Sequence, residues 1–306
     1  MILLVLACAG DPPAARAVTP APAPVPPVAA TLVAPEPGPD PAASTALVFV
    51  GDAGKGGAGQ KAVADAVKAW CAARRCDFVA YLGDNLYPAG ATSPDDPIFR
   101  DRFEVYWEGF DVPFYVALGN HDHMGDPQAE LDYAKTSRLW RMPARWYRFE
   151  QGIAEFLVLD TGPSPDGGKV AGEQLAWLQG ELARPAAPWR VAYGHHPIHS
   201  SGLHGASPAL ITGLEPIFRD GGVDLWLCGH DHHLEVLDDG VAPLEVISGG
   251  GSAARKVKPP VAGSVYLAPS LGFGYLVLEP GVAHLAMVEV EVGGGAKLAW
   301  RSELRK

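Results

Sequence analysis

The chain has 306 residues, of which 48% are hydrophobic, and its 35 acidic and 24 basic residues give a formal net charge of −11. This acidic balance argues against a nucleic-acid-binding protein, because such proteins carry a basic surface. The apolar run at residues 1–10 is far too short to span a membrane.

The first 43 residues differ in composition from the rest. Residues 1–8 resemble a bacterial lipoprotein signal with Cys8 as the lipidated residue, although no basic leader precedes it. An ordinary secretory signal or a chance apolar terminus are the alternatives. Residues 9–43 are rich in Pro and Ala and predict a disordered, extended linker that buries no core. We therefore expect export to the bacterial cell envelope, in the periplasm or on the outer surface, with Cys8 as the candidate lipid anchor.

Residues 44–306 are long enough for one α/β domain. Five short apolar runs closed by Gly predict buried strands that end at one edge of a sheet. They are residues 47–50, 79–82, 115–118, 191–193 and 225–228. Apolar residues at helical spacing predict a helix over residues 60–73 between the first two strands, and others over 173–183 and 208–219.

Further strands are predicted around these runs. Residues 146–149 and 156–160 are typical of two short strands. Residues 245–248, 275–279 and 284–292 are expected to form a second sheet, with a glycine turn at 293–295 before 298–300.

A polar residue follows the Gly that closes each of the five main runs. These residues are Asp52, Asp84, Asn120, His195 and His230. One Gly-Asp pair alone is usually a turn, but five repeats of the same pattern indicate one site. Ligands of open α/β sheets bind beyond the carboxyl ends of the strands, and carboxylate, amide and imidazole groups are metal ligands. The sequence therefore predicts a site for a pair of metal ions.

The residues around this pattern indicate a family. The motifs Asp84-Asn85-Leu86-Tyr87, Asn120-His121-Asp122-His123, His195-His196-Pro197 and His230-Asp231-His232 all follow predicted strands. With them the chain resembles the calcineurin-like metallophosphoesterases, and within these the tartrate-resistant, purple acid phosphatase branch. The resemblance begins near Ala46 and runs to the last strand. It implies an α/β fold of four layers, with two packed mixed β-sheets flanked by helices.

The resemblance also implies how a dinuclear centre is divided. One iron is expected on Asp52, Asp84, Tyr87 and His232. A second metal is expected on Asp84, Asn120, His195 and His230, so that Asp84 bridges the two. The implied pair is Fe(III) with a divalent Fe, Zn or Mn. The counterparts of the family's substrate-facing catalytic histidines are His121 and His204.

Tyr87 separates the acid phosphatase branch from its relatives. A phenolate ligand favours Fe(III) and gives the family its colour. The alternative is an ordinary core or rim aromatic beside Pro88. We expect three other histidines to support the site without binding a metal. They are His123, His196 and His199.

The expected activity is hydrolysis of small phosphomonoesters by in-line attack of metal-bound hydroxide, by a monomeric enzyme. No Gly-x-Ser-x-Gly motif competes with this interpretation. A phosphodiesterase or nucleotidase of the same superfamily is the main alternative, and a phosphate- or metal-binding surface protein is the less favoured one.

Cysteine usage agrees with export. Cys71 and Cys76 lie close enough in sequence to pair in an oxidising compartment, whereas Cys228 is expected to be a buried apolar residue.

Two features depart from the animal members of the family. Leu203 replaces an acidic residue before His204, and the loop at 161–171 is short, so we expect no activation by proteolysis.

Overall fold

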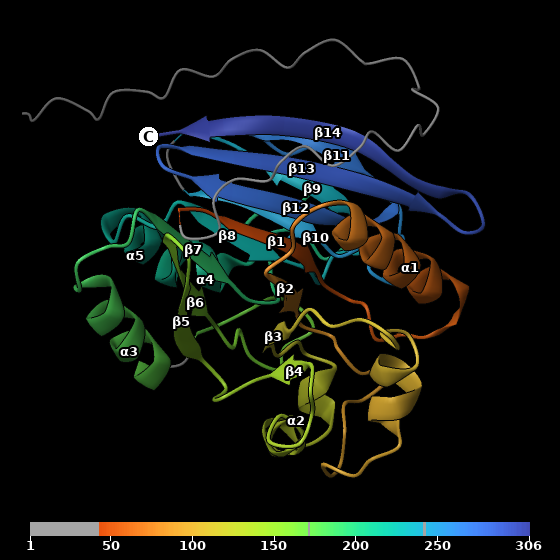
Figure 1. Cartoon of the computed structure of the whole chain (residues 1–306). Helices are drawn as coiled ribbons and strands as arrows, with labels where there is room; N and C mark the ends of the chain where they lie inside the picture. The colour runs from red at the N-terminus through yellow and green to blue at the C-terminus, as the bar shows by residue number, and fades with distance from the viewer. Residues whose placement is uncertain (1–42, 171, 241–242) are drawn as a thin grey trace, which may run out of the picture.

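Two seven-stranded mixed β-sheets pack face to face, with helices outside them, as Figure 1 shows. The computed structural model describes residues 43–170, 172–240 and 243–306. The predictions for the signal-like segment, Cys8 and nearly all of the linker therefore lie outside the described residues. No helix in the described part is both long and apolar enough to cross a membrane.

The first sheet has the order β14-β13-β12-β1-β2-β3-β4. Its parallel half consists of β1 (Thr45–Val50), β2 (Phe78–Leu82), β3 (Phe114–Ala117) and β4 (Trp140–Arg141). Its antiparallel half is formed by β12 (Leu271–Glu279), β13 (Val282–Glu291) and β14 (Gly295–Arg305). β1 joins the halves, because it pairs with β2 on one side and β12 on the other.

The second sheet has the order β11-β9-β10-β8-β7-β6-β5. Parallel pairing links β6 (Ala154–Val158), β7 (Trp189–Tyr193), β8 (Leu225–Cys228) and β10 (Leu244–Ser248). Antiparallel strands complete it on both sides. They are β5 (Tyr147–Gln151), β9 (Leu234–Leu237) and β11 (Ser264–Ala268).

The helices divide between the two sheets. α1 (Gly57–Ala73) lies against β12, β13 and β14, and α3 (Gly172–Leu182) lies on the opposite side of the molecule, near β5 and β6 (Figure 1). Two short helices, α4 (Pro208–Gly213) and α5 (Glu215–Asp220), join α3 in covering the second sheet. α2 (Pro127–Tyr133), a π-helical turn (Arg100–Glu104) and a 3-10 turn (Asp122–Met124) lie within connections.

Burial follows these layers. The larger apolar core lies between the two sheets, where Phe78 packs edge-to-face on Phe156 with ring centroids 4.9 Å apart. A second core lies under the outer helices, where Phe218 packs on Trp226 at 5.3 Å. Strands buried on both faces read as continuous apolar runs, as this sequence does. The predicted four-layer α/β fold is confirmed.

Three details of the sequence prediction were wrong. The five ligand-bearing strands do not end at one edge of one sheet, because β1, β2 and β3 belong to the first sheet and β7 and β8 to the second. The carboxyl-terminal strands β12 to β14 join the first sheet, and β10 alone of that predicted group lies in the second. The helix predicted over 208–219 is two helices that meet at Leu214. Pro216 explains the break, because its ring excludes an intact preceding helical turn.

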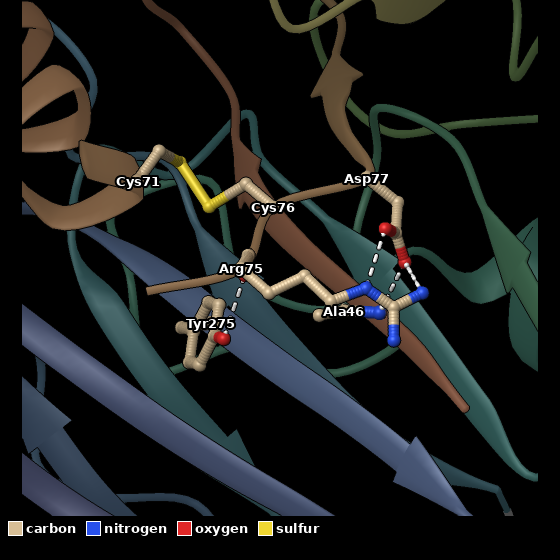
Figure 2. Close-up of a disulfide and its surroundings, with 6 residues drawn as sticks. All are labelled: Ala46, Cys71, Arg75, Cys76, Asp77 and Tyr275. Atoms are coloured by element: carbon tan, nitrogen blue, oxygen red, sulfur yellow. Dashed lines mark hydrogen bonds and ion pairs between the residues drawn. A yellow bond between two sulfur atoms is a disulfide. The ribbon is translucent and has the colours of Figure 1, made fainter. Parts of the chain in front are cut away.

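A disulfide fixes the connection from α1 to β2. Cys71 and Cys76 are bonded, as the sequence suggested, with their Cα atoms 5.4 Å apart (Figure 2). Beside the bond, the Asp77 carboxylate accepts the Ala46 backbone N–H at 2.8 Å and pairs with Arg75 at 2.7 Å (Figure 2). The Tyr275 hydroxyl donates to the Arg75 carbonyl at 2.8 Å. The turn is thereby tied to both β1 and β12. Cys228 is free and buried, as expected.

Candidate metal centre

The loops that leave the strands have unusual backbone geometry at the predicted ligands. Within the described ranges, just three non-glycine residues have positive φ, namely Asp52 (57°), Asp84 (53°) and His230 (66°). Left-handed backbone costs energy for a residue with a Cβ, and such strain concentrates at functional sites. All three residues are predicted metal ligands.

Two of the preceding glycines explain how the loops come so close. A Cβ on Gly119 would lie 2.2 Å from the Asp84 backbone nitrogen, and a Cβ on Gly229 would lie 2.5 Å from Asp52 Oδ2. Only glycine permits such an approach. The Gly229 contact joins the two sheets, because Asp52 follows β1 and Gly229 follows β8.

Three potential ligand atoms converge around the Tyr87 hydroxyl oxygen. It lies 2.7 Å from Asp84 Oδ2, 3.0 Å from Asp52 Oδ1 and 3.2 Å from His232 Nε2. His232 Nε2 lies 3.3 Å from Asp52 Oδ1. All four residues are buried. We call this set, Asp52, Asp84, Tyr87 and His232, the phenol cluster.

A second set of donors meets the other oxygen of Asp84. His195 Nε2 lies 3.3 Å from Asp84 Oδ1 and 3.2 Å from His230 Nδ1. Asn120 is buried. The backbone N–H of His121, the next residue in the chain, donates to Asp84 Oδ1 at 2.9 Å. We call Asp84, Asn120, His195 and His230 the imidazole cluster. The two oxygens of Asp84 thus face different clusters, which places this carboxylate between them.

Free donor atoms show that a metal fits these clusters. Asn120 Oδ1 is buried and accepts no hydrogen bond, which is costly for an amide oxygen. His195 donates from Nδ1 to the Leu82 carbonyl at 2.9 Å, which leaves the Nε2 lone pair directed at Asp84. A carbonyl partner of this kind usually orients a metal-binding histidine. The donor set therefore suits a hard ion in the phenol cluster and a divalent ion in the imidazole cluster.

The acid–base properties of the clusters also call for added positive charge. Burial raises the pKa of Tyr87, and the negative charges of Asp52 and Asp84 raise it further, well above its usual value. A phenolate there needs a cation beside it. Burial also lowers the pKa of His230, and the neighbouring His195 and His196 lower it further, so that its imidazole stays neutral and able to bind a metal.

The two predicted catalytic histidines lie on either side of the clusters. His121 donates from Nδ1 to the Pro88 carbonyl at 2.6 Å, and its ring lies 4.3 Å from that of Tyr87. The ring of His204 lies 4.3 Å from that of His230. His204 is exposed and His121 is partly exposed. Both imidazoles can therefore meet a substrate that reaches the clusters from solvent.

The sequence of the site can be placed among known proteins. The pattern of the calcineurin-like phosphoesterase family matches residues 45–234, well over half of the chain. The chain belongs to the calcineurin-like phosphoesterase family. Within the family, tartrate-resistant acid phosphatase type 5 of Rattus norvegicus is 32% identical over 252 residues, which cover 71% of this chain and 76% of that protein. The predicted family is confirmed.

Other members of the family give the same result. Purple acid phosphatase 7 of Arabidopsis thaliana is 31% identical, covering 69% of this chain and 71% of that protein. Tartrate-resistant acid phosphatase type 5 of Mus musculus is 35% identical over 58% of this chain, and the chain spans 61% of its length.

Solved structures support the fold. Purple acid phosphatase PPD1 from yellow lupin (Lupinus luteus) aligns with a TM-score of 0.70 and 18% identity, covering 88% of this chain and 55% of that one. GAP50, described as the anchor in the inner membrane complex of Plasmodium, aligns at 0.75 with 24% identity, covering 86% and 89%.

We expected three further histidines to support the site without binding a metal. Each of them has a hydrogen-bond or ion-pair partner outside the two clusters. His123 Nε2 lies 2.7 Å from Asp160 Oδ1. His196 uses both ring nitrogens, with Thr161 Oγ1 at 2.7 Å and the Ser164 carbonyl at 2.8 Å. His199 Nδ1 lies 3.4 Å from Glu245. His196 lies near His195 and His230, but neither of its ring nitrogens is free for a metal.

The sequence analysis gave no role to two buried carboxylates within the family motifs. Asp122 accepts the backbone N–H groups of Gly119 and Asn85 at 2.8 and 2.9 Å, which fixes the loops before Asn120 and after Asp84. Asp231 accepts the N–H of His204 at 3.0 Å and the Ser200 hydroxyl at 2.5 Å. Their position beside predicted ligands was visible in the sequence. Their partners Asn85, Ser200 and His204 are 27 to 37 residues away in the chain, so these contacts were not visible.

Proposed function

We propose that this chain is a dinuclear, metal-dependent phosphatase that hydrolyses small phosphomonoesters, with Fe(III) in the phenol cluster and a divalent Fe, Zn or Mn ion in the imidazole cluster. One observation carries the proposal. The carboxylate of Asp84 faces both clusters, and the donor atoms of the two clusters include no Lys or Arg. Relatives that are named acid phosphatases support the reaction class.

Two close metal ions would activate water and stabilise the attacking and leaving oxygens of an in-line displacement. The protein supplies the rest. The carbonyl of Pro88 accepts from His121 Nδ1 and orients the ring, so that Nε2 lies 3.9 Å from Asp84 Oδ2 and, when it too carries a proton, can donate to a phosphate or leaving oxygen. Asp231 holds the backbone of His204 beside His230. We assign these two histidines to bind phosphate oxygens and to protonate the leaving oxygen.

The activity is tested with the metal-loaded full chain, p-nitrophenyl phosphate and its bis-ester. We expect a strong preference for the monoester. His204→Asn should lower kcat/KM for the monoester by roughly a hundredfold to ten-thousandfold, because it removes a proton donor. The matched control is His284→Asn on β13 of the first sheet, where the histidine pairs with Glu279 at 3.1 Å. This variant should change kcat/KM little.

Each other outcome contradicts the proposal in a different way. Faster cleavage of the bis-ester would identify a phosphodiesterase. Metal binding without hydrolysis of either ester would identify a binding protein. A phosphoenzyme trapped with labelled substrate would replace direct attack by water with attack by a protein side chain.

We further propose that the protein is exported to a bacterial cell envelope and anchored through a lipid on Cys8. The Cys71–Cys76 disulfide supports export, because such bonds persist in oxidising compartments. Fractionation of cells that express the full chain tests this. The chain should lie in the membrane fraction and Cys8→Ser should not, whereas wild-type protein with reduced Cys71 and Cys76 in the cytosol would contradict export.

A further inference from the structure

The segment between β10 and β11 brings a concentration of positive charge into an acidic protein. Arg255, Lys256 and Lys258 lie within four residues of one another, while the whole chain carries a net charge of −11. All three are exposed. We call Arg255 and Lys256 the basic pair.

Backbone contacts place this segment along the edge of the metal centre. The hydroxyl of Ser252 donates to the Asp52 carbonyl, and the N–H of Arg255 donates to the carbonyl of His232 at 2.8 Å. Both acceptors belong to residues of the phenol cluster. The first residue of the basic pair is therefore hydrogen-bonded through its backbone to a predicted metal ligand.

The far end of the segment reaches the loop that carries His204. The N–H of Lys258 donates to the Ser201 carbonyl at 2.7 Å, and its ammonium donates to the Leu203 carbonyl at 2.8 Å. Lys258 thus has a structural task, since it holds the residue before His204. The segment as a whole runs from the phenol cluster to a catalytic histidine.

The basic pair has no acidic partner among the described residues. Neither Arg255 nor Lys256 forms an ion pair with any carboxylate of residues 43–170, 172–240 or 243–306. In contrast, Arg145 lies on the side of His123, and its guanidinium is 3.4 Å from Asp160. Unpaired cations at the edge of a site raise the local concentration of anions, and a guanidinium can bind a phosphate with two hydrogen bonds.

We propose that Arg255 and Lys256 form a second anion subsite, which selects phosphomonoesters whose organic part carries another phosphate group. One phosphate would lie at the metal centre between His121 and His204, and the other against the basic pair. The inference rests on the proposed phosphatase function and names the class of substrate that this site prefers.

The test compares fructose 1,6-bisphosphate with fructose 6-phosphate, using the metal-loaded full chain. The wild type should prefer the bisphosphate by about three- to tenfold in kcat/KM, the range expected of two exposed charges. Arg255→Gln/Lys256→Gln should reduce that preference to about twofold or less, while activity on p-nitrophenyl phosphate stays within about twofold. Added salt should reduce the wild-type preference in the same way.

The matched control removes two positive charges elsewhere. Lys297→Gln/Arg301→Gln changes two exposed residues on β14, the outermost strand of the first sheet. It should keep the preference for the bisphosphate. Equal preference in the wild type and the Arg255/Lys256 variant would overturn the inference, and so would equal loss on all substrates.

A binding measurement separates this inference from the proposed function. Calorimetry compares propane-1,3-bisphosphonate with propylphosphonate on the same proteins. If no ester is hydrolysed, the phosphatase proposal fails, but tighter binding of the bisphosphonate that depends on the basic pair would still support the subsite. Equal affinity for the two phosphonates would overturn it.

Discussion

The two ends of β7 hold charged groups in opposite ways. At the amino-terminal end, the fully buried Glu155 accepts from Arg190 at 2.7 Å and from Arg148 at 2.9 Å. At the other end, the chain leaves β7 for His195, which meets Asp84 and His230 in the imidazole cluster. One end pairs an acid with two bases. The imidazole cluster at the other end joins the Asp84 carboxylate to two imidazoles, with no Lys or Arg among its donor atoms.

This difference separates charges that stabilise the fold from charges that are arranged to bind a ligand. Arg190 has further acceptors, with the Leu182 carbonyl at 3.3 Å, so the amino-terminal end is satisfied by the protein itself. Asn120 Oδ1 has no partner, and the Tyr87 hydroxyl is crowded by two carboxylates. Buried charge of one sign is expensive unless it is compensated. In the proposed function, metal ions would supply the compensation that arginine gives at the amino-terminal end.

The largest effect is expected at the bridging carboxylate. Asp84→Asn should lower phosphatase activity by about a thousandfold or more, because loss of one metal removes several kcal/mol of transition-state stabilisation. Metal analysis should show fewer than two ions per chain. The control Asp65→Asn, at an exposed acid paired with Lys61 on α1, should keep both ions and full activity. Two bound ions in Asp84→Asn would contradict the bridging assignment.

At the opposite end, Glu155→Gln should lower the free energy of unfolding by about 3–5 kcal/mol, because it leaves Arg190 buried without its charge partner. Metal content should not change. Glu303→Gln, at an exposed pair with Arg305, should cost less than about 1 kcal/mol. Denaturant unfolding measures both. Loss of metal from folded Glu155→Gln would show that the two ends are not independent.

The disulfide should have a smaller effect. Replacing Cys71 and Cys76 together by Ser should lower the free energy of unfolding by about 2 kcal/mol, since the bond closes a short loop. Activity should stay within about twofold, because the turn faces β1 and β12 and not the clusters. Reduction of the wild type should give the same loss of stability, and strong inactivation by reduction would contradict this separation.

A pH titration gives the finest test of the amino-terminal end. Burial raises the pKa of Glu155, but hydrogen bonds from Arg190 and Arg148 outweigh this and hold it below the usual value. The unfolded chain therefore takes up this proton first as the pH falls. The stabilisation is complete above the unfolded pKa, near 4.5, and is lost as the pH falls through the folded value.

The stability difference between wild type and Glu155→Gln should therefore shrink at acid pH. Urea unfolding at pH 6 and at successively lower pH measures it with the same metal loading in both proteins. A difference that stays constant or grows would contradict a lowered pKa for Glu155.

Local patterns in the sequence were enough to predict much of the fold and to select residues that the structure brings together in two clusters. A Gly followed by a metal-binding side chain marks where a strand ends, whatever sheet the strand joins. For the same reason the pattern could not assign β7 and β8 to the second sheet, because a strand buried on both faces reads the same in either. Strand partners are set by contacts distant in sequence.

Two features that the sequence analysis missed also depend on contacts between residues distant in sequence. Glu155 and Arg190 are single charges within apolar strands, and only the pairing of β6 with β7 brings them together. The sequence shows that Arg255 and Lys256 are adjacent. It does not show that they lie near the phenol cluster, which follows from the hydrogen bond between Arg255 and His232. Helix-breaking Pro216 was a local signal that the apolar spacing of residues 208–219 outweighed.

Metal content and the visible absorption spectrum of the full chain, measured beside Tyr87→Phe, test the account most directly. Two ions per chain, one of them iron, with a visible band that Tyr87→Phe removes, are the predicted result. A colourless protein with two zinc or manganese ions would contradict the assignment of Tyr87 to Fe(III), and a chain that binds no stoichiometric metal would contradict the dinuclear centre itself.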